Sequence, residues 1–373
     1  MRRAGKLSVI VALIGAVLFI IGIIIEPRQA LTSYVFAYAV AFTIVLGALF
    51  HLMIGQLTGA RWFDAFRQLA LNVTAATPAL AVLVIPILLG VRAIYPWTAP
   101  SLLSPDAQRL IARKAGWLNV PFFSVRAIVY VAIWVIFAEL VRRLSVRREG
   151  ASADDDSVRA HKLRKTSAAG VIFVGLALTF ASFDWLMSLE PTWYSTIYGV
   201  YLFAGGILAA LGLVAAMASR RAGGRASLLD SATDDQRGAL GTLLFTYTIF
   251  WAYIGFAQFL IIWIGDIPAE ASWYVTRTRT SWAILAVLTA VGQFALPFLL
   301  LLPHSLKRRP GLLAWVGVWI VAMHVVDVYW IVLPALHPGG ISLSWLDAAA
   351  LLLVGGVIAG TMHWRTAMPE YHS

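Results

Sequence analysis

Cysteine is absent from this sequence of 373 residues. Without thiolates, the chain offers no cysteine ligands for an iron–sulfur cluster, no disulfide and no thiol nucleophile. Charge is also scarce, because Asp, Glu, Lys and Arg together make up 13% of the chain while 60% of its residues are hydrophobic. That composition excludes an ordinary soluble domain. The sequence also has no glycine-rich phosphate loop, zinc-binding pattern or nucleophile elbow.

The most prominent features of the sequence are long apolar runs. Ten of them are long enough to cross a hydrocarbon layer of about 30 Å as helices, and too continuous for the alternating strands of a membrane barrel. They cover residues 7–25, 34–54, 70–90, 124–141, 168–187, 195–217, 239–264, 282–302, 312–335 and 345–363. The first run is too long for a signal peptide and has no cleavage pattern after it. We therefore predict an all-α polytopic membrane protein with ten transmembrane helices and a single integral membrane domain over 1–373.

The basic residues are distributed unevenly between the two sides of such a protein. With ten spans, the side that carries both termini holds 21 of the 29 Lys and Arg residues. The positive-inside rule then places both termini in the cytoplasm. The net charge of +11 is explained by this topology, so we expect no nucleic-acid partner. The charged segment 141–165 is expected to be a solvated loop that contacts anionic lipid.

A histidine and an aspartate interrupt the ninth apolar run. His324 lies about 18 Å along a helix from Leu312, near the middle of the hydrocarbon layer, and Asp327 follows one turn later on nearly the same face. An aspartate there costs on the order of 3 kcal/mol by insertion scales, so it usually occupies a polar interior that handles ions, protons or a ligand. The alternative is a hydrogen-bonded pair that fixes helix packing.

Histidines also bear on the question of haem. Only His51, His324 and His363 fall within apolar runs, and His51 and His363 are both near cytoplasmic ends. No spacing motif supports a haem between these two, so we expect the chain to bind no redox cofactor and no metal.

One non-cytoplasmic loop is long, at residues 91–123. It contains a short amphipathic segment with Ser104 placed to cap a helix and Pro105 in its first turn. We expect a helix that lies in the membrane interface, and the alternative is a docking platform for an external partner.

Other polar residues form a sparse pattern in the remaining runs. Helical spacing places Thr248, Trp251, Gly255 and Gln258 on one face, which is expected to point into the bundle. Glu139 is expected to pair with Arg142 or Arg143. Asp184 has no basic neighbour on its own helix, although Arg92 or Arg126 could neutralise it. The outer acids Glu190, Asp266 and Glu270 are expected to be interfacial and structural.

Three ordered motifs carry a family resemblance. They are SFDWLMSLEPTWYSTIYGVYLFAGG at 182–206, FTYTIFWAYIGFAQFLIIWIGDIPAEASWY at 245–274 and MHVVDVYWIVLP at 323–334. Together they resemble the ActF subunit of bacterial alternative complex III, a quinol:cytochrome c oxidoreductase of respiratory electron transport. The resemblance covers most of residues 168–335, while the first four runs match mainly in number and arrangement.

The resemblance has implications for fold and partners. ActF is similar to the NrfD and polysulfide-reductase membrane subunits, which implies two four-helix bundles, at 31–187 with its periplasmic loop 91–123 and at 188–335. Residues 336–373 would form a peripheral last helix and a cytoplasmic tail. The expected location is the bacterial inner membrane, beside an NrfD-like paralogue (ActC), an iron–sulfur subunit and cytochrome c subunits with haem c. The chain itself would hold no redox centre, although quinol or quinone remains open as a ligand.

Two uses of the polar residues follow from this family. A proton pathway needs groups whose protonated and ionised forms are close in energy, and burial brings an aspartate and a histidine nearer to that condition. The candidates for such a pathway are His324, Asp327, Asp184, Gln258, Glu139 and His51. A quinone pocket needs a lipid-open cleft with aromatic walls. The candidates for quinone or outer-side contacts are Trp185, Glu190, Trp193, Trp251 and Asp266.

Three alternatives to these uses stay open at the level of sequence. The tryptophans and Tyr194 could instead form an interfacial aromatic belt. The whole chain could be a free-standing secondary transporter, which interrupted helices would favour. It could also be a structural anchor without transfer chemistry.

The charge distribution gives a testable topology. Reporter fusions at Gly150 and at Ser101 should report opposite compartments, with position 150 cytoplasmic and position 101 periplasmic, because the basic loops stay inside. The same compartment signal from both positions would rule out the ten-span topology.

Overall fold

The computed structural model describes residues 2–60, 64–145, 153–220 and 226–367. Secondary structure in these residues is helical, without strands. Ten helical segments are long and apolar enough to cross a membrane. The prediction of an all-α polytopic membrane protein with ten transmembrane helices is therefore confirmed.

In the first half of the chain, the third span is divided into short helices and the other spans are continuous helices. The bounds are α1 Arg2–Ile25, α2 Pro27–Thr58, α3 Asp64–Thr74, α4 Thr77–Leu83, α5 Ile85–Leu89, α6 Val91–Ile94, α7 Pro105–Arg113, α8 Val120–Ser145 and α9 Ala153–Trp185. The third span runs from Asp64 to Leu89, through α3, α4 and α5.

The second half of the chain begins after a short 3₁₀ turn. Its bounds are α10 Tyr198–Ala218, α11 Leu228–Ser231, α12 Asp234–Gly265, α13 Pro268–Thr278, α14 Trp282–Thr289, α15 Leu296–Leu301, α16 Pro310–Val332 and α17 Trp345–Thr366. A π-helical stretch at Ala290–Ala295 joins α14 to α15, so the eighth span is a helix with a local widening.

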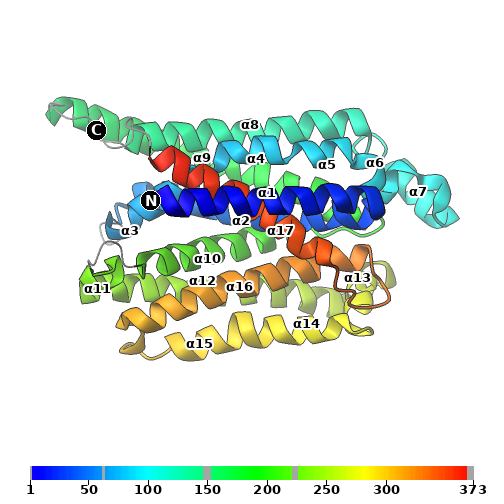
Figure 1. Ribbon diagram of the computed structural model, residues 1–373. Coiled ribbons are helices and arrows are strands. Elements are labelled where there is room, and N and C mark those ends of the chain that lie inside the picture. Colours follow the sequence, from blue (N-terminus) through cyan, green and yellow to red (C-terminus); the bar gives the residue numbers. More distant parts are fainter. Residues whose placement is uncertain (1, 61–63, 146–152, 221–225, 368–373) are drawn as a thin grey trace.

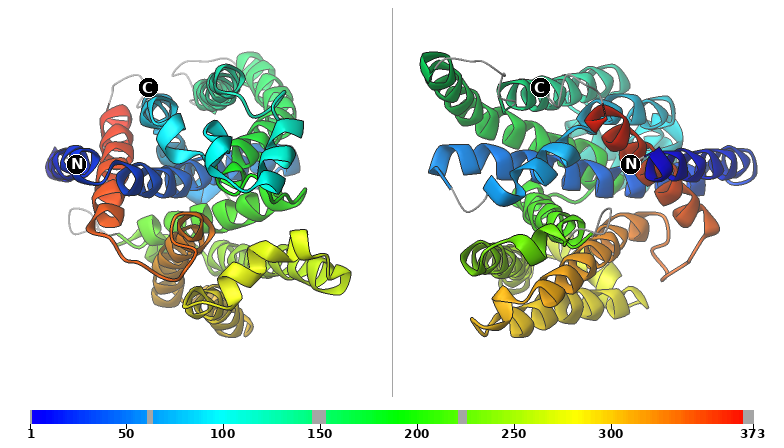
Figure 2. Two further views of the ribbon diagram at one scale, coloured as in Figure 1. Left: turned by 90° about the vertical axis from the view of Figure 1, so that its right-hand side faces the viewer. Right: turned by 60° about the vertical axis from the view of Figure 1, so that its left-hand side comes forward.

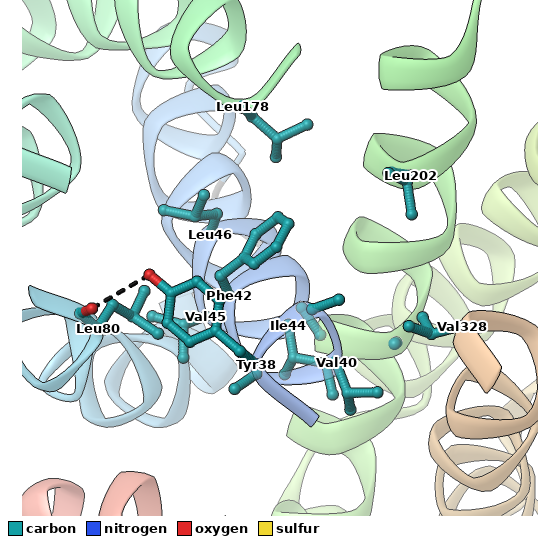
Figure 3. Close-up of a cluster of buried hydrophobic side chains, with 14 of the residues drawn as sticks. Tyr38, Val40, Phe42, Ile44, Val45, Leu46, Leu80, Leu178, Leu202 and Val328 are labelled. Atoms are coloured by element: carbon teal, nitrogen blue, oxygen red, sulfur yellow. Dashed lines mark hydrogen bonds between the residues drawn. The ribbon is translucent and has the colours of Figure 1, made fainter. Parts of the chain in front are cut away.

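Helix α2 is the centre of the fold. Every residue from Gln29 to Met53 is buried, because α9, α10, α16 and α17 all pack against this helix. Figure 1 shows α4, α8 and α9 on one side of it and α10, α12, α14, α15 and α16 on the other. Helices α1 and α17 lie against each other along the outside, as the two views of Figure 2 also show. Figure 3 shows side chains of α2 meeting Leu178 of α9, Leu202 of α10 and Val328 of α16.

Two glycines allow α2 and α10 to touch backbone to backbone. A Cβ on Gly206 would lie 2.6 Å from the carbonyl oxygen of Thr43, and a Cβ on Gly47 would overlap the Gly206 carbonyl. Small residues at such crossings let membrane helices approach closely, where dispersion between backbones replaces the missing hydrophobic effect. The crossing also fixes Thr43 in the centre of the molecule.

The third span departs from the continuous helix expected over 70–90. Pro78 and Pro86 stand near the starts of α4 and α5, and each removes a backbone donor from the helix. Tyr34 donates its hydroxyl hydrogen to the Leu83 carbonyl at 2.7 Å, and Tyr38 donates to the Leu80 carbonyl at 3.1 Å, a bond drawn in Figure 3. Helix breaks at membrane depth are tolerated where neighbouring groups satisfy the backbone, as Tyr34 does at Leu83, while the Leu80 carbonyl also accepts from the Val84 amide.

Two predictions about the connecting segments have different outcomes. The prediction of a loop over 141–165 is wrong for its described part, because α8 continues to Ser145 and α9 begins at Ala153, while residues 146–152 lie outside the described residues. The short helix in 91–123 is confirmed as α7, and the Ser104 side chain accepts a hydrogen bond from the Ala107 amide. Helix α7 lies at the end of the molecule opposite the N-terminus (Figure 1).

The α2–α10 crossing can be tested with one methyl group. Gly206→Ala should lower the thermal unfolding midpoint of the purified chain, because overpacking costs about 1–3 kcal/mol. Gly355→Ala in α17 is the matched control, since a Cβ there meets no atom within 4 Å, and it should leave the midpoint unchanged or raise it. Equal midpoints for the two variants would contradict the close crossing.

Candidate functional site

Asp327 lies in the interior of the second half of the bundle. Its side chain is buried on α16, where the residue is 1% exposed. The Tyr201 hydroxyl of α10 donates to Oδ1 at 2.6 Å, and Trp251 Nε1 of α12 donates to Oδ2 at 3.2 Å. Among the described residues, no ion pair joins this carboxyl to a basic side chain. Two neutral donors from two other helices are therefore its hydrogen-bond partners.

His324 has a different partner from Asp327. Its Nε2 lies 2.8 Å from Thr43 Oγ1, and Thr43 donates its own hydroxyl hydrogen to the Ala39 carbonyl at 2.7 Å. We therefore assign the ring proton to Nε2, which leaves Nδ1 as a buried acceptor with no hydrogen-bond partner in the described residues. Gly205 makes room for the ring, since a Cβ there would lie 3.2 Å from Nδ1. The histidine thus connects α16 to α2.

A cavity of about 700 Å³ adjoins Asp327 through its two partners. Tyr201 and Trp251 both line it, together with residues of α12, α13, α14 and α16. Most of the wall is aromatic or aliphatic, and Gln258 is one of its few polar residues. At its edge, Tyr253 and Phe256 are 65% and 61% exposed on a transmembrane helix, so the cavity opens toward lipid. Trp330 also lines it, and its indole Nε1 is buried with no partner in the described parts of the chain.

The predicted polar face of α12 is confirmed by burial. Thr248, Trp251 and Gln258 are buried, and the last two reach the cavity. The face of the eighth span that carries Thr289 and Gln293 is buried as well. These helices therefore turn their polar residues toward the interior of the bundle.

Two of the proton-pathway candidates, His51 and Glu139, lie elsewhere in the molecule. His51 Nε2 lies 2.9 Å from the Ile207 carbonyl oxygen, and its ring packs edge-on against Tyr247. Glu139 accepts from Arg143 at 3.2 Å, as expected, and also from Arg365 of α17 at 2.8 Å. Arg142, the other expected partner of Glu139, donates to the Leu71 carbonyl. Glu139 thus joins α8 to the last helix.

Asp184 forms a buried ion pair with Arg126 and accepts hydrogen bonds from two further side chains. Arg126 of α8 donates to both of its carboxylate oxygens, at 2.7 and 2.9 Å. The Tyr130 hydroxyl and Trp117 Nε1 donate to the same carboxylate, each at 2.8 Å. The guanidinium of Arg126 lies 4.0 Å from the centre of the Trp117 ring. Four hydrogen bonds and a full counter-charge therefore balance this carboxylate within the protein.

Glu190 is the acid of a second ion pair, on the same side of the membrane. It accepts from Arg277 Nη2 at 2.7 Å. Arg277 is fully buried, donates to the carbonyls of Trp273, Trp330 and Ile331, and stacks 3.6 Å from the centre of the Trp273 ring. This pair ties the segment after α9 to α13 and α16, so Glu190 has the expected structural contacts.

The aromatic-belt interpretation is wrong for three of its four residues. Trp185, Trp193 and Trp251 are buried within the protein, and only Tyr194 is exposed. Trp185 packs against Tyr38, Phe42 and Trp134 in the first half of the bundle. Trp193 donates to the Glu270 carbonyl and stacks on Trp273. Trp251 alone of the three reaches the cavity.

The remaining outer residues lie at the surface of the bundle. Asp266 is exposed and ends α12 in a left-handed conformation with φ of 45°. Lys114, after α7, donates to the Pro191 carbonyl at 2.7 Å. Partial burial lowers the pKa of the Lys114 amine because the charged form loses contact with water. Neither residue lines the cavity.

One buried network was missed at the sequence level. Asp347, at the start of α17, accepts from Ser33 at 2.6 Å and from Gln29 at 3.3 Å, both on α2, and from Tyr329 of α16 at 3.3 Å. His337 Nε2 lies 2.7 Å from the Gln29 side-chain oxygen. The spacing of Ser344 and Asp347 is a capping-box signal that could have located the acid. It could not have located the partners on α2.

Metal ligands and related proteins give no further assignment. No group of three or more His, Asp or Glu side chains that could hold a metal ion occurs in the described parts of the chain. No model of a known protein family matches the sequence, and no curated protein matches it.

A double-mutant cycle tests whether Asp184 is structural. Arg126→Met should destabilise the purified chain by about 3–5 kcal/mol, because it leaves a buried carboxylate without its cation. Combining it with Asp184→Leu should recover much of that loss. Thermal unfolding of the two single variants and the double variant provides the measurement. A double variant as unstable as the sum of the singles would contradict a closed pair.

Proposed function

We propose that this chain is a membrane subunit of a quinol:cytochrome c oxidoreductase of the alternative complex III type, in the bacterial inner membrane with both termini cytoplasmic. It holds no redox centre and works beside an ActC-like paralogue, an iron–sulfur subunit and cytochrome c subunits with haem c. Its own contribution is a transmembrane proton pathway that includes Asp327. The three ordered motifs support the assignment to the complex, and the surroundings of Asp327 support the proton pathway.

The observation that carries the proton pathway is the pair of neutral donors on Asp327. Burial away from water disfavours the ionised carboxylate, whereas the hydrogen bonds from Tyr201 and Trp251 stabilise it. No cation in the described residues holds the group in one state. A carboxyl under these two opposing influences is suited to take up and release a proton. Asp184 and Glu139 differ from Asp327 in this respect, because each forms an ion pair with an arginine.

Tyr201 supplies a connection between Asp327 and the cavity. Its hydroxyl donates to the carboxyl, and the residue also lines the cavity wall. A hydroxyl can accept one proton while it donates another, so it can pass a proton between a group in the cavity and Asp327. One turn earlier on nearly the same face of α16, His324 contacts α2 through Thr43. We therefore place Tyr201, Asp327 and His324 on the pathway, with Gln258 at the outer part of the cavity.

Removal of the exchangeable proton tests the pathway. Asp327→Asn keeps the shape of the side chain and can still accept hydrogen bonds, so the complex should assemble. Proton transfer coupled to quinol oxidation should fall by at least about tenfold, since positioned acid–base groups contribute factors of this size or more. Tyr201→Phe should give a smaller loss in the same direction. The measurement is proton release by the assembled complex in vesicles over a range of pH.

The control for this experiment is Asp266→Asn, which removes an exposed carboxylate from the end of α12. Proton release should match that of the unsubstituted complex. If Asp327→Asn also leaves proton release and its pH dependence unchanged, Asp327 is a packing residue and the pathway is elsewhere.

The cavity itself favours a second candidate function, the binding of a quinone ring. It opens between lipid-exposed aromatic residues, which is the route by which a lipid-soluble quinone would enter. Its walls offer rings for stacking, and the side-chain amide of Gln258 is a donor for a quinone carbonyl. In this function the two electrons of a bound quinol would leave to the iron–sulfur subunit, and its two protons would pass one after the other to Asp327 through Tyr201.

The matched pair Gln258→Leu and Gln293→Leu tests quinone binding. Both changes remove a buried side-chain amide, but only Gln258 lines the cavity. Gln258→Leu should weaken binding of a fluorescent quinone analogue about fivefold, the effect of one lost hydrogen bond, and Gln293→Leu should not change it. Equal affinities of the two variants for the quinone analogue would contradict quinone binding in this cavity.

A secondary transporter receives less support from the broken third span. Interrupted transporter helices expose backbone carbonyls to a substrate cavity. Here the Leu80 and Leu83 carbonyls are occupied by tyrosine hydroxyls in the packed interior. The interruption therefore has a structural explanation.

A further inference from the structure

A separate cavity of about 340 Å³ lies at the rim of the second half of the bundle. We call it the rim cavity. It is lined by Asp235, Gly238 and Thr242 of α12 and by His304 and Arg308 of the turn between α15 and α16. In Figure 1 the starts of α12 and α16 are at the same end as the N-terminus, which is the end with most of the chain's basic residues. The rim cavity therefore faces the leaflet on the positively charged side.

Two glycines of α12, of which Gly238 lines the rim cavity, bring the basic turn close to this helix. A Cβ on Gly241 would lie 2.6 Å from the Lys307 carbonyl oxygen, and a Cβ on Gly238 would lie 3.4 Å from Arg308 Nε. The basic turn consequently rests directly on the surface of α12. This close contact positions the Arg308 side chain at the cavity, so its placement is determined by backbone packing.

The charged residues that line the rim cavity are Arg308 and Asp235. Arg308 Nε is buried and has no hydrogen-bond partner in the described residues. The nearest acid is Asp235, whose carboxylate lies 3.8 Å from Arg308 Nη2 and is 94% exposed, so this surface pair is weak. Lys307 and Arg309 flank Arg308 in the sequence. Because Nε is buried against Gly238 while the side chain as a whole is 37% exposed, the Nη groups of the guanidinium are the donors that a phosphate oxygen can reach.

We propose that the rim cavity binds the phosphate of an anionic phospholipid headgroup. A lipid is favoured over free phosphate because Leu299 and Leu302, in the last turns before His304, are both exposed on a transmembrane segment. Acyl chains can run along these leucines while the phosphate meets Arg308. Basic sites between helices at the positively charged side of a membrane protein recognise anionic lipids in this manner. The proposal is independent of the proton pathway and of quinone.

The test uses the full chain, purified in mild detergent and supplemented with defined lipids. Native mass spectrometry and thermal unfolding are recorded with phosphatidylglycerol, with phosphatidylcholine, and with inorganic phosphate at the same concentration. Phosphatidylglycerol should remain bound and raise the unfolding midpoint, and the other two should not. An equal rise of the unfolding midpoint with phosphatidylcholine would show that binding does not depend on the charge of the headgroup. Equal protection by inorganic phosphate would show an anion site without lipid, and either result overturns the proposal.

Two variants with opposite expected effects locate the site. Arg308→Gln should weaken phosphatidylglycerol binding about fivefold to tenfold, whereas Asp235→Asn should strengthen it, because it removes the one acid at the cavity. Arg279→Gln is the matched control, an exposed arginine beside α13 that is not part of the rim cavity and should bind as the unsubstituted chain does. If Arg308→Gln fails to fold, Asp235→Asn decides alone. Unchanged binding in Asp235→Asn, or the same loss in Arg279→Gln as in Arg308→Gln, would overturn the proposal.

Discussion

The hydrocarbon core of a membrane has no hydrogen bonds to give, so each polar group buried in this protein needs a partner from the protein itself. That constraint explains why α2 is the axis of the fold. Tyr34 and Tyr38 satisfy the carbonyls of the broken third span, Thr43 meets His324, and Ser33 meets Asp347. These bonds, with the glycine crossing to α10, position the polar residues of three other helices around one buried helix.

The same constraint separates two kinds of buried acid. Asp184 has a bidentate arginine and two further donors, so its charge is balanced where it stands. Asp327 has a hydroxyl and an indole N–H, which donate hydrogen bonds but carry no charge. The first arrangement balances the charge of the carboxylate with a cation, and the second does not. The proposed division between a structural acid and an exchanging acid rests on this contrast, together with the cavity beside Tyr201.

The sequence was sufficient for features that depend on neighbours along the chain. Apolar run length predicts the ten spans, helical spacing predicts the buried face with Thr248 and Gln258, and a capping residue with proline predicts α7. The sequence was insufficient for contacts between helices. A helix that is apolar on every face gives no signal for which face packs against its neighbours. Arg126 and Asp184 are 58 positions apart, and Thr43 and His324 are 281 apart. The tryptophans were misplaced for the same reason. The sequence pattern of an aromatic residue near the end of a span is the same whether its side chain faces lipid or protein.

The most direct test of the account is the protonation state of Asp327 itself. Infrared difference spectra of the purified chain in lipid, recorded as the pH is changed, detect the C=O stretch of a protonated buried carboxyl. The account predicts a band that changes with pH, disappears in Asp327→Asn and persists in Asp184→Asn, provided that both variants remain folded. A spectrum without such a band, or one that is the same in Asp327→Asn, would contradict the claim that Asp327 exchanges a proton.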